Sequence, residues 1–159
     1  ILLHIVDMAP FDGTEPADSA VAIAGELGRF SATLAERERW LVLNKTDLID
    51  AETFAERKTA VLAALDWQGP VYEVSAIKGE GTDALCGDLM NYLEELREQE
   101  KADPELAHAD VELQQRMQEE ARERIAELRS QHKRRADQEA EDDDDWDDDE
   151  YDVDVEYVP

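Results

Sequence analysis

A short polar loop directly after the apolar run 40–43 contains the residues best suited to chemistry: Asn44, Lys45, Thr46 and Asp47. A carboxylate such as that of Asp47 can accept two parallel hydrogen bonds. The guanine edge offers two adjacent donors, N1–H and the exocyclic amine, whereas adenine presents the opposite polarity and is rejected. Asn44 can serve the base N7 and nearby backbone. The stem of Lys45 can cover the base, with its ammonium near ribose or phosphates, and Thr46 should point away. The spacing predicts a guanine-reading loop.

A second short stretch, Ser75-Ala76-Ile77, ends the next predicted strand and completes this hypothesis. The Ser75 hydroxyl can brace the Asp47 carboxylate, and the Ala76 backbone N–H can donate to guanine O6. A small side chain at position 76 lets the base come close, and Ile77 is expected to close the pocket. An ordinary polar loop between a strand and a helix is the alternative interpretation. The candidate base-binding residues are Asn44, Lys45, Thr46, Asp47, Ser75, Ala76 and Ile77.

The predicted elements alternate between strands and helices, which indicates an α/β domain with a mostly parallel sheet. Strands are expected at 1–6, 40–43 and 71–74, and helices at about 18–34, after Asp50 and after Thr82. Asp18 or Ser19, Asp50 and Thr82 are the expected caps of these helices. The loops that follow parallel strands meet at the carboxyl edge of the sheet, where such folds bind ligands.

The first strand has two expected features. Ile1 to Val6 is almost continuously apolar, which is typical of a parallel strand covered on both faces. His4 interrupts the run, and we expect a core histidine with satisfied ring nitrogens. The chain begins inside this strand without an initiator Met or a basic segment. We therefore expect no signal peptide, and a chain that is a piece of a longer protein.

Charge and cysteine content restrict the function classes. The 159 residues carry a formal net charge of −26, and residues 137–159 hold 14 acids and no base. This charge argues against binding a phosphate backbone through a broad basic face. Cys86 is the only cysteine, so no internal disulfide can form, and a reducing, cytoplasmic location fits. No apolar run approaches the roughly 18 residues of a membrane span, and a monomer is expected.

The composition changes after Leu96, which predicts three parts: 1–97, a charged amphipathic helical extension at 98–136 and an acidic tail at 137–159. Pro104 can begin the long helix, and Glu120 can pair with Arg124 one turn later. This helix either lies on its own domain or binds a partner. We expect disorder in the tail, because its acids repel one another. The tail either engages a basic partner through its spaced aromatics or only keeps the chain soluble.

The two loop stretches resemble the base-recognition motifs of translation-factor-type P-loop GTPases. The segments Leu2–Asp7, Glu26-Leu27 and Leu43–Leu48, followed by an acidic tail, resemble the bacterial Obg GTPases. This resemblance implies a Rossmann-like G domain and binding of GTP and GDP with Mg²⁺. It also implies GTP hydrolysis in large ribosomal subunit assembly and in growth or stress control. Guanine nucleotide and the large ribosomal subunit are the implied partners.

The chain departs from that family in the phosphate-binding half of the site. It contains no Gly-x-x-x-x-Gly-Lys-Ser/Thr loop, and no Asp-x-x-Gly precedes Ile1. The resemblance therefore implies an incomplete G domain with no catalytic or metal-binding residues in this chain. Because hydrolysis depends on positioned phosphates and metal, we expect no GTP turnover by the chain alone. The alternative function is a non-catalytic binding module, in which the long helix and the acidic tail engage a basic protein or ribosomal partner.

Overall fold

A computed structural model describes the backbone of residues 1–143 and the side chains of residues 1–134. The chain divides into two compact units, Ile1–Ala121 and a second that begins at Arg122. The elements, in order, are β1 (Leu2–Asp7), α1 (Pro16–Phe30), α2 (Ala32–Ala35), β2 (Arg39–Asn44), the 3₁₀ turn η1 (Thr46–Leu48), α3 (Ala51–Ala64), β3 (Val71–Val74), α4 (Thr82–Ala102) and α5 (Pro104–Asp143).

The sheet has three parallel strands in the order β1-β2-β3, so the prediction of an α/β fold with a parallel sheet is confirmed. Asp7 lies opposite Asn44 in the register, and Asn44 lies opposite Val74. The three strands therefore end at one level. The loops that follow them form what we call the loop edge, residues 7–9, 44–48 and 75–81.

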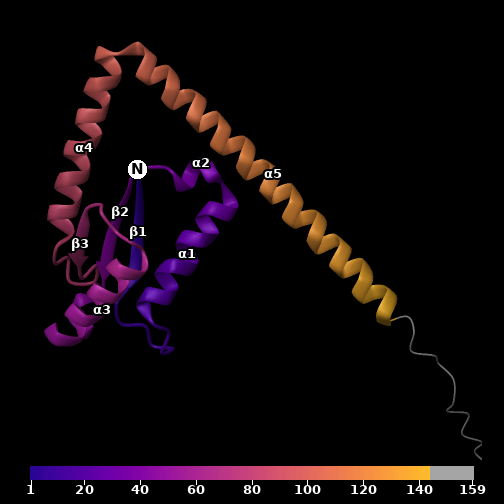
Figure 1. The fold of residues 1–159 in the computed structure, drawn as a ribbon, viewed down its shortest axis with the longest axis horizontal. Coiled ribbons are helices and arrows are strands. Elements are labelled where there is room, and N and C mark those ends of the chain that lie inside the picture. Colours follow the sequence, from indigo (N-terminus) through magenta and orange to yellow (C-terminus); the bar gives the residue numbers. More distant parts are fainter. Residues whose placement is uncertain (144–159) are drawn as a thin grey trace, which may run out of the picture. The chain divides into compact units, whose positions relative to one another are not determined.

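Helices cover the sheet on both faces (Figure 1). On one face, Leu41 and Leu43 pack with Ala20 of α1 and Val61 of α3. On the other, Trp40 and Val42 pack with Val74 of β3 and Leu85 of α4. Successive β2 side chains alternate between the two faces. The strand that leads to residues 44–47 is thus the most deeply buried part of the sheet.

The expectation that β1 is covered on both faces is wrong for the described residues. Val6 is buried with the α1 and α3 side, but Ile5 is 55% exposed and Leu3 is 37% exposed. These two residues lie level with Trp40 and Val42 in the register. The α4 cluster covers β2 and β3 but not β1, which lies at the opposite edge of the sheet from β3.

His4 is buried as predicted, but it is not satisfied. Its side chain is on the covered face of β1, and neither ring nitrogen has a hydrogen-bond partner among the described residues. Burial, together with the positive charge of Arg39, lowers the pKa of His4 below its ordinary value. The imidazole is therefore neutral in the folded chain at physiological pH.

The predicted helix at 18–34 begins earlier and is broken near its end. Pro16 starts α1, because its fixed φ suits the first helical position and it has no N–H to satisfy. Neither Asp18 nor Ser19 is the cap. Ser31 has an extended backbone, ends α1, and caps α2 by accepting a hydrogen bond from the Leu34 amide at 2.9 Å.

The two other predicted caps had opposite outcomes. Asp50 caps α3 as predicted, accepting from the Glu52 and Thr53 amides at 3.0 Å each. Thr82 does not cap α4, because Gly81 holds that position with φ of 75°. A Cβ atom on Gly81 would lie 2.2 Å from the Glu73 carbonyl oxygen, so the chain passes there only without a side chain.

The C-terminal helices differ in detail from the prediction. α4 runs to Ala102, past the expected boundary at residue 97, and α5 begins at Pro104 as predicted. The Glu120–Arg124 pair is wrong, because Arg124 pairs with Glu127 at 2.6 Å. α5 continues to Asp143, so the first residues of the expected disordered tail are helical. Ala, Gln and Glu there favour helix. The predictions for residues 144–159 fall outside the described part of the chain.

Within the described residues, no helix combines the length and the apolar character needed to span a membrane.

Candidate functional site

The loop edge brings together both stretches that the sequence singled out. The stretch 44–47 follows β2 and the stretch 75–77 follows β3, and these strands are paired in parallel. Because the strands end at one level, polar groups from the two loops can contact one another. The structure therefore brings most of the candidate residues into one hydrogen-bonded group.

Asn44 ties the two loops together. Its side-chain oxygen accepts from the Lys45 amide at 2.8 Å and from the Ala76 amide at 3.1 Å. The predicted contact of Asn44 with neighbouring backbone is confirmed. The Ala76 N–H expected to serve guanine O6 is instead engaged by Asn44. Because the Asn44 oxygen accepts both of these hydrogen bonds, the amide NH₂ group remains a candidate donor to a base.

Lys45 adopts the left-handed conformation, with φ of 67°. This turns the chain sharply into η1 and places Asp47 in the turn. The Lys45 ammonium lies 2.5 Å from an Asp7 carboxylate oxygen, and the other Asp7 oxygen accepts from the Ala9 amide at 2.9 Å. The ammonium is therefore held at the end of β1, and its expected place near ribose or phosphates stays a prediction. Thr46 is half-buried within the turn.

Asp47 carries the least satisfied polar group of the loop edge. Its side chain is only 5% exposed, and the Oδ1 atom has no hydrogen-bond partner among the described residues. The other oxygen, Oδ2, lies 3.9 Å from the Lys78 ammonium. The Ser75 hydroxyl has the largest effect and, with Lys78, holds the pKa of Asp47 below its usual value. Oδ1 is therefore a buried acceptor that no donor of the described residues reaches.

The loop after β3 is closed on itself around Ser75. Ser75 is fully buried, its amide donates to the Glu80 carbonyl at 2.9 Å, and its hydroxyl accepts from the Lys78 amide at 3.3 Å. The predicted bracing of Asp47 by Ser75 agrees with the lowered pKa. Ile77 is 88% exposed, so it closes no pocket in this structure.

Two residues that contact the loop-edge side chains, Asp7 and Lys78, were assigned no role in the sequence analysis. Asp7 holds Lys45 across the two strands, and Lys78 is the nearest cation to Asp47. The position of Asp7 at the end of the first apolar run was the available signal. Its partner could be identified only from the strand register. Lys78 had no sequence signal, because a lysine in a glycine-containing loop is usually solvated.

The loop edge presents three kinds of group that can bind a ligand. It offers one buried carboxylate oxygen without a donor, one amide NH₂ group and a half-buried lysine stem. In the part of the chain that the structure describes, no three His, Cys, Asp or Glu side chains come together as a metal site.

No protein-family model matches this chain.

Proposed function

We propose that the chain supplies the guanine-recognition half of a GTP-binding site, with Asp47 as the residue that selects the base. The support is the unpaired Asp47 Oδ1 atom, buried in a side chain that is 5% exposed. N1–H and the exocyclic amine of guanine would donate to this carboxylate, one of them to the Oδ1 atom that has no donor among the described residues. Asn44 would reach N7, and the stem of Lys45, restrained by Asp7, would lie beside the ring.

The phosphates would be held elsewhere, since this chain has no Gly-x-x-x-x-Gly-Lys-Ser/Thr loop. We accordingly propose GTP hydrolysis as an activity of a longer Obg-type protein, with the 159-residue chain binding guanine weakly and turning over no GTP. Action in large ribosomal subunit assembly rests on the family resemblance alone. Cosedimentation of the longer protein with large ribosomal subunits tests that part.

A series of nucleosides tests base recognition without requiring any phosphate contact. Backbone amide resonances of Asn44, Asp47 and Ala76 are followed by NMR during titration with guanosine, inosine or adenosine. Inosine keeps N1–H but lacks the exocyclic amine, so it should bind about tenfold more weakly than guanosine, since a hydrogen bond to a charged group is worth about 1.5–3 kcal/mol. Adenosine should cause no shift. Equal shifts with guanosine and adenosine would contradict base selection by Asp47.

A further inference from the structure

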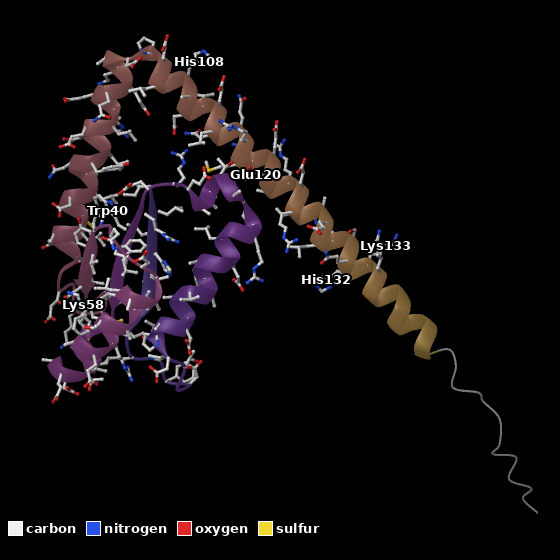
Figure 2. All side chains as sticks on the ribbon, viewed as in Figure 1. Trp40, Lys58, His108, Glu120, His132 and Lys133 are labelled. Atoms are coloured by element: carbon white, nitrogen blue, oxygen red, sulfur yellow. The ribbon has the colours of Figure 1, made fainter. Side chains whose placement is uncertain are left out.

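A second polar cluster lies away from the loop edge. Here α5 residues 110–120 contact residues 31–37, which connect α1 to β2. The Glu120 carboxylate accepts three hydrogen bonds: from the Ser31 hydroxyl at 2.5 Å, the Thr33 hydroxyl at 2.6 Å and the Thr33 amide at 3.1 Å. The residues are far apart in sequence, and all belong to the first compact unit. Figure 2 shows Glu120 beside α2.

A second contact lies ten residues earlier on the same helix. Arg37, just after α2, forms an ion pair with Asp110 at 2.8 Å, and both side chains are mostly buried. Two acids on one helix therefore bind both ends of the short segment 31–37. Ser31 and Thr33 supply hydroxyl and amide donors at one end, and Arg37 supplies a cation at the other. Segment 31–37 therefore holds both of these α5 acids, although it also contains Glu36.

The docked helix adds little to the hydrophobic core. Neither hydrophobic cluster includes a residue from 104–121. Two clefts, of about 430 and 360 Å³, separate this part of α5 from α4 and from the start of β1. Leu106, Leu113 and Met117 line these clefts and belong to neither hydrophobic cluster. Opening a closely packed contact costs free energy, because many van der Waals contacts are lost. Residues 104–121 lie outside both hydrophobic clusters, so less free energy should be needed to move them away.

The connection to α4 allows movement. Asp103 ends α4 in an extended conformation, and Pro104 begins α5 without a backbone N–H. The Asp103 side chain accepts a hydrogen bond from the Glu105 amide at 3.0 Å. This bond caps the first turn of α5, so α4 ends and α5 begins as separate helices at Asp103. A change in backbone angles at Asp103 alone would swing α5 without unfolding either helix.

We propose that residues 31–37 form a docking site for an acidic helix, and that α5 residues 104–121 occupy it reversibly, as a strap held by Glu120 and Asp110. The occupant is this chain's own helix, because Glu120 and Asp110 of α5 contact the two ends of the segment. Release of the strap would free Ser31, Thr33 and Arg37 for another acidic helix. This inference is independent of the guanine proposal.

Amide hydrogen exchange tests the contact directly, since the Thr33 amide donates to Glu120. In Glu120→Gln and Glu120→Ala, Thr33 should exchange about tenfold faster or more than in the unchanged chain. The matched control is Glu119→Gln, which removes the same charge from the exposed neighbouring position. Its Thr33 exchange should stay within about twofold. Unchanged exchange in Glu120→Ala would overturn the docking contact.

Electron paramagnetic resonance tests release of the strap. Spin labels are placed on the exposed native Cys86 of α4 and on a Gln118→Cys position of α5. One narrow distance is expected in the labelled chain and in its Glu119→Gln form. A broad distribution is expected when Glu120→Ala and Asp110→Asn are combined. A narrow distribution in that combination overturns the reversible strap, even if Thr33 exchanges faster. Unchanged tryptophan fluorescence confirms that each variant is folded.

Discussion

The loop edge and the strap are both polar, but they are attached to the fold in opposite ways. The loop edge continues directly from β2, whose Leu41 and Leu43 are fully buried. The strap is joined through Glu120 and Asp110 over two open clefts. On this rigid base the Asp47 Oδ1 atom has no hydrogen-bond partner among the described residues. On the strap, in contrast, Glu120 and Asp110 are both paired, and these contacts attach the helix to the fold.

The largest predicted effect compares a leucine beneath the loop edge with a leucine on the strap. Leu43→Ala should cost about 2–5 kcal/mol of unfolding free energy, since a fully buried leucine leaves a cavity. Leu113→Ala, on the strap and outside both clusters, should cost less than about 1 kcal/mol. Urea unfolding followed by tryptophan fluorescence measures both. Equal losses would show that the strap is part of the core.

Gly81, which precedes α4, and Gly87, inside α4, give a second contrast. Gly81→Ala should destabilise the chain by about 2 kcal/mol or more, because the new Cβ meets the Glu73 carbonyl and the φ is strained. Gly87→Ala, in the middle of the same helix with no atom within 4 Å, should stabilise it by up to about 1 kcal/mol. Thermal unfolding provides the comparison. A harmless Gly81→Ala would mean that the loop after β3 is not fixed by this close approach.

The smallest predicted effect is the pH dependence of the strap. Hydrogen bonds from Ser31 and Thr33, with a smaller effect of Arg116, hold the pKa of Glu120 below its ordinary value of 4.5. Its stabilising contribution is therefore present above pH 4.5 and is lost as the pH falls through the lowered pKa. The Glu120 carboxyl carbon shift, followed by NMR, should have its midpoint below 4.5. Replacing Ser31 and Thr33 with alanine should raise it towards 4.5. A midpoint at or above 4.5 in the unchanged chain would contradict the contact.

Much of the fold could be predicted from local pattern, because short apolar runs, proline and capping residues act over a few positions. The parallel sheet, β3 and the Asp50 cap are cases of this kind. The exposure of Ile5 and the unpaired nitrogens of His4 depend on which elements lie beside β1, and no local pattern shows that.

The candidate site divides in the same way. The presence of Asn44, Asp47 and Ser75 at one edge followed from strand order. The capture of the Ala76 amide by Asn44 and the pairing of Lys45 with Asp7 did not, because they are set by side-chain geometry across strands. Glu120 was paired with the wrong residue for the same reason. A helical neighbour one turn away was predicted, but hydroxyls 87 and 89 positions away compete better.

The substitution Asp47→Asn replaces one carboxylate oxygen with an NH₂ group. It is the most direct test of the claim that Asp47 selects guanine. Guanosine and xanthosine are titrated against the unchanged chain and against Asp47→Asn, with chemical shifts at Asn44 and Ala76 as the readout. The control, Asp66→Asn, makes the same charge change at an exposed position away from the loop edge. The unchanged chain and the control should prefer guanosine. Asp47→Asn should weaken guanosine binding about tenfold or more and prefer xanthosine, whose edge offers an acceptor where guanine has a donor. An unchanged preference for guanosine in Asp47→Asn would contradict base recognition by Asp47.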